Sequence, residues 1–258
     1  MTQLAGLPAM LHPQVQRLCD GLVAVLGDTV AVVIHGSVAL GDFHAHQSDL
    51  DVLVFCAGQP DANQHQQLAR LMLAVSGHPA PLEISVLDVA TLVAWHHPAP
   101  FYFHFGESWR GALQTALTDP AHDWLAVRHD PDLTAHLVVA HRHGLLVYGR
   151  CTLPEPTTAD AMAAVWYDIA TAPEQVVVEP VYVILNLCRT LYWLRTGEVL
   201  SKSAGGRALL PELTGEARQV VQQVLAMRDG DEISPPHPDA LRRVAQQLLD
   251  EIERRRSS

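Results

Sequence analysis

Two aspartates stand one residue apart in the stretch HGSVALGDFHAHQSDLDVLVF, at residues 35–55. Side chains alternate between the two faces of a strand, so Asp49 and Asp51 should point the same way while their apolar neighbours point into the core. Two carboxylates this close repel each other unless a cation neutralises them. Mg²⁺ takes oxygen ligands and is commonly held by one or two carboxylates together with substrate phosphates. The spacing therefore predicts a Mg²⁺ site at Asp49 and Asp51.

A third carboxylate follows in the alternating stretch PLEISVLD, at residues 81–88. Its apolar residues share one face, which leaves Glu83 and Ser85 on the other. If this strand lies beside the one that contains Asp51, Glu83 joins the two aspartates. Three such carboxylates can bind two metal ions about 3.5–4 Å apart, or they can leave one carboxylate as a general base. Without the aspartates, a solvated position on an amphipathic strand would be the favoured interpretation of Glu83.

Other residues have the chemistry to bind a phosphate. Gly36 would let the backbone approach a ligand, and Ser37 offers a hydroxyl near a helix start, although an ordinary tight turn uses the same residues. Arg189 lies in the otherwise apolar stretch VYVILNLCRTLYWL, so its cation needs a partner or a cleft. Lys202, in GEVLSKSAGG, suits a phosphate as a point charge and also fits a solvated loop.

The elements that must position these residues change in type along the chain. Up to residue 149, short β-branched runs alternate with amphipathic stretches, and Asp130 and Pro131 predict the N-cap and first position of a helix. Residues 150–160 carry two prolines and no periodicity, which indicates a linker. Helical patterns without a convincing strand follow at 178–198, 215–230 and 237–256. We predict an α/β domain at residues 1–153 and an all-α helical bundle domain at residues 154–258.

Composition narrows the class of protein. The 258 residues carry a net charge of −11, which disfavours nucleic acid as a partner and attracts cationic small molecules, although it also serves solubility. No apolar run approaches the roughly 20 residues needed to cross a bilayer, and the N-terminal stretch does not resemble a secretory signal. The four cysteines are scattered without a C-x-x-C pair, as is typical of reduced thiols in a cytoplasmic protein. The 15 histidines form no H-E-x-x-H zinc motif.

The stretch GSVALGDFHAHQSDLDVLV resembles the signature of the DNA polymerase β-like nucleotidyltransferase superfamily: Gly-Ser, a further Gly, and Asp-x-Asp preceded by Ser48. The segments LEISVLD, FHFGESW, DPDLTAHLVVAHRHGLLVYG and LNLCRTLYWLRTGEVLSK resemble, in the same order, segments of the aminoglycoside adenylyltransferases that modify streptomycin and spectinomycin. The resemblance implies a mixed-sheet nucleotidyltransferase domain, a helical C-terminal domain and an active site in the cleft between them.

The resemblance also implies a role for each candidate residue. Asp49 and Asp51 would hold Mg²⁺, as two ions, on ATP, and Glu83 would deprotonate the attacking hydroxyl. The positions that match nucleotide-binding residues of the family are Gly36, Ser37, Ser48, Arg189 and Lys202. The positions that match substrate-facing residues are Glu83, Trp109 and Glu179. The segment FGESW carries an extra Ser108, and the stretch with Trp166, Asp168 and Glu174 departs most from the family, so those two acids also fit helix-end charges.

The implied reaction is Mg²⁺-dependent transfer of AMP from ATP to a hydroxyl of an aminoglycoside, with release of pyrophosphate. The implied enzyme is a cytoplasmic monomer that confers antibiotic resistance and has no nucleic-acid or membrane partner. Three alternatives stay open: the same transfer to another small molecule or a protein hydroxyl, a catalytically inactive nucleotide-binding module, and a metal-dependent hydrolase. The presence of all three carboxylates disfavours the inactive module, and dependence on a nucleotide would separate the hydrolase.

Overall fold

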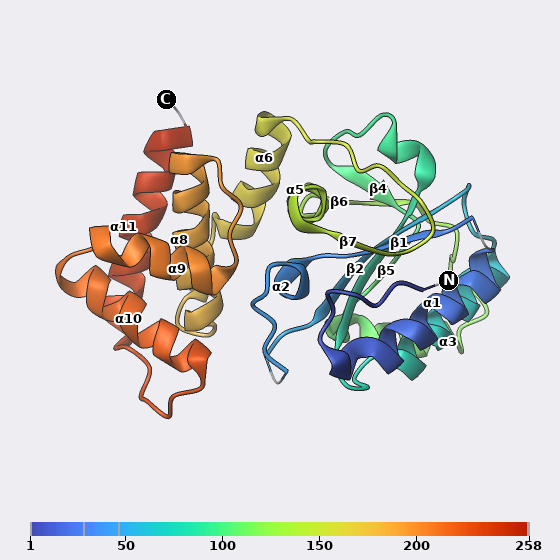
Figure 1. Ribbon diagram of the computed structural model, residues 1–258, viewed down its shortest axis with the longest axis horizontal. Helices are drawn as coiled ribbons and strands as arrows, with labels where there is room; N and C mark the ends of the chain where they lie inside the picture. Colours follow the sequence, from blue (N-terminus) through green and yellow to red (C-terminus); the bar gives the residue numbers. More distant parts are fainter. Residues whose placement is uncertain (1, 28, 46, 257–258) are drawn as a thin grey trace. The chain divides into compact units, whose positions relative to one another are not determined.

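The computed structural model describes residues 2–27, 29–45 and 47–256 and divides into two compact units, Met1–Asp160 and Ala161–Ser258 (Figure 1). The division falls after Asp160, whereas the sequence placed the domain boundary after residue 153. Of the expected linker at residues 150–160, residues 150–157 form neither helix nor strand, whereas the last three residues begin the helix Thr158–Ile169.

The first unit is built on a mixed five-stranded sheet. Its strand order is β5-β3-β2-β1-β7. The strands β2 and β3 pair in parallel and the remaining neighbours pair antiparallel. A separate two-stranded sheet joins β4 and β6. The strands are β1 (Ala31–Ile34), β2 (Leu50–Cys56), β3 (Leu82–Asp88), β4 (Ala99–Phe101), β5 (Phe103–Phe105), β6 (Arg128–Asp130) and β7 (Leu145–Tyr148).

Helices cover both faces of the five-stranded sheet (Figure 1). Val52 and Val54 of β2 belong to a buried cluster with apolar residues of α1 (His12–Leu26) and α3 (Ala62–Val75). Leu53 and Phe55, which alternate with them, belong to a second cluster with residues of α5 (Leu133–His143). Because Asp51 is two residues from Leu53, strand alternation places its side chain on the face covered by α5.

Local sequence explains where the helices of this unit begin. A capping box starts α3: the Asp61 carboxylate accepts from Gln64 N at 2.8 Å, and the Gln64 side chain accepts from Asp61 N at 2.9 Å. The expected start of α5 at Pro131 was wrong. Asp130 ends β6 and its carboxylate accepts the backbone N–H of Asp132 at 2.9 Å, so it forms a turn and the helix starts at Leu133. The shorter helices are α2 (Gly36–Ala39), α4 (Arg110–Ala116) and the 3₁₀ turns Ala9–Leu11, Val89–Leu92 and Glu107–Trp109.

The second unit is helical, and its part that the structure describes, residues 161–256, contains no strand. Buried residues of α8 take part in one apolar cluster with those of α10 and α11, as the sequence predicted for this half of the chain. None of the described helices of the protein is long and apolar enough to span a bilayer. The helices are α6 (Thr158–Ile169), α7 (Ala172–Gln175), α8 (Pro180–Thr196), α9 (Lys202–Leu209), a 3₁₀ turn (Leu210–Glu212), α10 (Gly215–Asp229) and α11 (Pro238–Arg256).

Candidate active site

Strand pairing brings two of the three predicted carboxylates together. In the parallel register of β2 and β3, Asp51 lies directly opposite Glu83, and neighbouring strands are about 4.8 Å apart. Both side chains are partly exposed on the face of the sheet that α5 covers, and Asp49, immediately before β2, is exposed. The strand adjacency that the sequence left conditional is therefore present.

Gly36 is required by the carboxylate of Asp51. The glycine has a φ of +62°, and a Cβ added to it would lie 1.7 Å from Asp51 Oδ2. The backbone N–H of His35 donates to the carbonyl oxygen of Asp51 at 3.0 Å, which holds the two segments together. The sequence suggested that Gly36 clears space for a ligand; in the structure, it clears space for a side chain that is a candidate metal ligand.

The two predicted serines differ in environment. Ser37 Oγ is buried in α2 and has no hydrogen-bond partner among the described residues. An unsatisfied buried hydroxyl costs about 1–3 kcal/mol, which a bound acceptor would relieve. Ser48 is buried beside Asp49, and its hydroxyl accepts from the backbone N–H of His44 at 3.1 Å. Ser48 therefore has a structural contact in the loop that precedes the aspartates.

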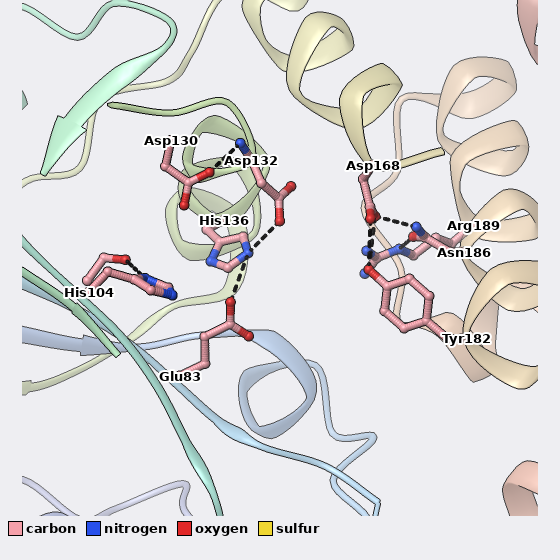
Figure 2. A network of polar contacts seen from close by, with 10 residues as sticks. Glu83, His104, Asp130, Asp132, His136, Asp168, Tyr182, Asn186 and Arg189 are labelled. Atoms are coloured by element: carbon pink, nitrogen blue, oxygen red, sulfur yellow. Dashed lines mark hydrogen bonds and ion pairs between the residues drawn. The ribbon is translucent and has the colours of Figure 1, made fainter. Parts of the chain in front are cut away.

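A histidine of α5 stands between Glu83 and a further acid (Figure 2). His136 Nε2 lies 3.1 Å from Asp132 Oδ2 and 3.9 Å from Glu83 Oε1. Burial opposes the charged imidazolium, but Asp132, Glu83 and Asp51 outweigh it and raise the pKa of His136 to about 10. The candidate site therefore contains its own cation beside the proposed general base.

Two other histidines near the site favour the neutral form. His35 is buried, with its ring centroid 5.1 Å from that of His136, and burial together with the His136 charge lowers its pKa well below 6.5. His104 Nδ1 lies 3.0 Å from Ser85 Oγ, and burial lowers its pKa although Glu83 and Asp130 oppose the shift.

Trp109 is connected to this side of the sheet through His104. The two rings pack edge to face with centroids 5.7 Å apart, and the Arg128 guanidinium lies 5.6 Å from the Trp109 ring centroid. Ser85, the hydrogen-bond partner of His104, is two residues from Glu83 and shares its face of β3. Trp109, the predicted substrate-facing residue, is exposed. It contacts His104, which in turn contacts Ser85 of the strand that carries Glu83.

In the second unit, the predicted phosphate-binding cations Arg189 and Lys202 belong to one network of contacts. Figure 2 shows the part of this network around Arg189. Arg189 Nε donates to Asn186 Oδ1 at 2.6 Å, and Asn186 Nδ2 donates to Asp168 Oδ2 at 2.5 Å. The Tyr182 hydroxyl is 3.0 Å from both Asp168 oxygens, and Lys202 Nζ lies 4.0 Å from the Tyr182 ring centroid. Asp168 is therefore part of this network and is not simply a helix-end charge.

Close packing of two helices brings Lys202 and Arg189 to this network. A Cβ added to Gly205 of α9 would lie 2.5 Å from the Arg189 Cα, so only glycine lets α9 approach α8 this closely. Ser201 starts α9 by accepting from the backbone N–H of Ala204 at 3.1 Å, which places Lys202 at the first helical position.

The other acids and aromatics named from the sequence have simpler surroundings. Glu179 is exposed, directly before α8, and its side chain makes no capping hydrogen bond. Glu174 is exposed in the first turn of α7. The Trp166 ring lies 4.3 Å from the Arg256 guanidinium carbon. None of these contacts identifies a substrate.

The donor set fits Mg²⁺ bound together with a nucleotide. Among the residues that the structure describes, no group of three or more His, Cys, Asp or Glu side chains is arranged to hold a metal ion. Asp49 and Asp51 alone offer two carboxylates, and Mg²⁺ commonly takes one or two protein carboxylates and completes its shell with phosphate oxygens and water. The absence of a side chain at Gly36 leaves the room that the Asp51 carboxylate occupies.

Sequence patterns missed the histidines of the site. They also missed three polar partners: Asp132, Tyr182 and Asn186. Asp132 and His136 are four residues apart on one helix face, which is a recognisable pairing signal once the helix start is known. Asn186 stands three residues before Arg189 on a nearly apolar helix, which marks it as a potential partner of the cation.

Residues 153–251 match the aminoglycoside adenylyltransferase C-terminal domain family. A spectinomycin 9-adenylyltransferase of Staphylococcus aureus is 26% identical over 197 residues, which cover 72% of this chain and 73% of that protein. An aminoglycoside (3'') (9) adenylyltransferase of Escherichia coli is 23% identical over 207 residues, which cover 74% of each chain. The chain is therefore similar to aminoglycoside adenylyltransferases over about three quarters of its length.

A solved structure extends this similarity to the fold of the chain. The crystal structure of the spectinomycin adenyltransferase from Enterococcus faecialis with ATP and spectinomycin matches it with a TM-score of 0.79 at 20% identity. The match covers 94% of the present chain and 99% of the other. The predicted fold class, a mixed-sheet domain followed by a helical one, is confirmed.

Proposed function

We propose that this protein transfers AMP from ATP to a hydroxyl of an aminoglycoside of the streptomycin or spectinomycin type, with release of pyrophosphate. The observation that carries the proposal is the register of β2 and β3, which sets Asp51 opposite Glu83 beside Gly36. The relatives named as adenylyltransferases and the structure determined with ATP and spectinomycin support the same reaction class.

The chain's own residues divide the chemistry between them. Glu83 would take the proton of the acceptor hydroxyl, whose oxygen attacks the α-phosphorus of ATP while the bond to the pyrophosphate oxygen breaks. Asp49 and Asp51 would hold one or two Mg²⁺ ions with the triphosphate. When bound there, Mg²⁺ would neutralise part of the negative charge on the phosphates. Arg189 and Lys202 would neutralise the charge that accumulates on the departing pyrophosphate.

Acceptor recognition is proposed for Glu83, Trp109 and Glu179. An aminoglycoside is polycationic and rich in hydroxyls, so carboxylates and an aromatic face suit it. Exposure of Trp109 and Glu179 is compatible with that role. We further propose that the enzyme acts as a monomer in the cytoplasm, without a nucleic-acid partner. The four free thiols support the cytoplasmic location, and the net charge of −11 disfavours nucleic acid.

Mass spectrometry of an aminoglycoside panel tests the proposal. Purified protein is incubated with ATP, Mg²⁺ and each drug, and Asp49→Asn serves as the control that removes one metal-binding carboxylate. The expected result is an AMP adduct on streptomycin or spectinomycin that the control does not form. Binding of ATP without an adduct on any drug would overturn the aminoglycoside assignment and favour another acceptor.

A further inference from the structure

The network around Arg189 has a fixed direction of hydrogen bonding. A carboxylate only accepts hydrogen bonds and a guanidinium only donates them. Between them, Asn186 donates from Nδ2 to Asp168 and accepts at Oδ1 from Arg189 Nε. Turning the Asn186 amide over would set donor against donor and acceptor against acceptor, and both bonds would be lost. Asp168 therefore fixes the amide, and the amide fixes the guanidinium.

This contact leaves the other edge of the guanidinium available. Arg189 uses Nε, and its two terminal nitrogens make no hydrogen bond or ion pair with the residues that the structure describes. Two parallel N–H groups are the donors that bind phosphate oxygens in pairs. Asn186 is only 3% exposed, so water competes poorly for its oxygen. The Nε contact thus selects one orientation of the cation.

Asp168 also reaches the second cation. It accepts from the Tyr182 hydroxyl, which lies 3.0 Å from both of its oxygens, and the face of the same ring lies against Lys202 Nζ at 4.0 Å. A cation over an aromatic face is held electrostatically by the ring. One carboxylate is therefore connected to Arg189 through Asn186 and to Lys202 through Tyr182.

We propose that Asp168, Asn186 and Tyr182 are positioning residues that orient Arg189 and Lys202 toward the nucleotide triphosphate. This inference rests on the proposed function. Under this proposal the negatively charged Asp168 helps to form a site for an anion. The charge of Asp168, taken alone, would repel phosphate. Simple charge reasoning says that removing Asp168 should tighten ATP binding, whereas the positioning role says that it should weaken it. The sign of the change separates the two.

Calorimetric binding of ATP and of AMP to the full-length chain, both with Mg²⁺, tests the inference. We expect Asp168→Ala and Asn186→Leu each to weaken ATP binding about five- to tenfold, the effect of losing one or two hydrogen bonds. The affinity for AMP should change less than about twofold, because AMP lacks the two outer phosphates and makes fewer of these contacts. Asp168→Asn keeps an acceptor oxygen and should recover most of the affinity.

The matched control is Glu216→Gln, which removes a carboxylate from the same unit. Glu216 pairs with Arg243, with contacts of 2.8 and 3.0 Å, and takes no part in the network. Thermal unfolding verifies that each variant folds. If Asp168→Ala does not fold, Tyr182→Phe keeps the ring, loses one hydroxyl and should weaken ATP binding about two- to threefold.

The inference would be overturned if Asp168→Ala bound ATP as tightly as the unchanged protein or more tightly. Where Asp168→Ala does not fold, the same result for Tyr182→Phe would overturn it. The proposed function would stand in either case. Equal weakening of ATP and AMP would also overturn the inference, because a general structural defect would then account for the loss. Absence of ATP binding by the unchanged protein would overturn the proposed function and this inference with it.

Discussion

Replacing Gly36 by alanine should displace the Asp51 carboxylate. The added Cβ would lie 1.7 Å from Asp51 Oδ2, and an ordinary contact begins at 3.4 Å, so the two atoms must separate by about 1.7 Å more. A misplacement of about 1 Å in an active site can lower the rate about 100-fold. The φ of +62° adds a backbone cost of about 1–2 kcal/mol for a residue with a Cβ.

Gly41→Ala separates strain from displacement. Gly41 has a similar φ of +68°, but a Cβ there meets no atom within 4 Å. Gly41→Ala should lose about 1–2 kcal/mol of unfolding free energy in thermal or urea unfolding, and Gly36→Ala should lose at least as much because it also overlaps Asp51. Only Gly36→Ala should lose AMP transfer, by at least about 100-fold in kcat, measured as pyrophosphate release. Equal kcat values for the two variants would refute the reasoning, because displacement of Asp51 would then have no effect on the rate of AMP transfer.

Two further predictions concern Glu83 and the histidine beside it. Glu83→Gln should lower kcat about 10²- to 10⁴-fold and change the KM for ATP less than about threefold, because a general base acts on the acceptor hydroxyl; a large rise in the KM for ATP would instead indicate a role in nucleotide binding. His136 has a pKa raised from 6.5 to about 10, so its contribution to stability is complete below pH 6.5 and is lost as the pH rises through about 10. An NMR titration should place the His136 midpoint well above 6.5 and lower it in Asp132→Asn, and a midpoint near 6.5 in the unchanged protein would contradict the ion pair.

The strands that carry the carboxylates were predictable because their signal is local. Alternation in PLEISVLD put Glu83 and Ser85 on one face, and the structure shows Leu82, Ile84 and Val86 buried on the other. The pairing of this strand with β2 needed a long-range contact, so the sequence could only state it conditionally. Strands β4, β5 and β6 have three residues each, too few for a periodic pattern.

Longer-range polar contacts were beyond the sequence patterns. His136 meets Glu83 across 53 positions of chain, and Asn186 meets Asp168 across 18. Neither pair follows from a spacing rule, because the packing of separate elements creates it. The start of α5 was predicted wrongly for a different reason: an aspartate before a proline is compatible with both an N-cap and a turn, and the carboxylate bonds two residues ahead.

The parallel pairing of β2 with β3 makes the separation of Asp51 and Glu83 independent of the chain between them. Backbone hydrogen bonds of neighbouring strands set that separation, while the exposed turn at residues 57–59 only connects β2 to the segment that leads into α3. Evolution can lengthen or shorten this turn without moving the two acids apart. A one-residue shift in the register of the whole of β2 is different, because it turns every side chain of the strand to the opposite face. Asp51 would then point toward α1 and α3, away from α5. The site therefore tolerates changes of length in its connection and is intolerant of changes in its strands.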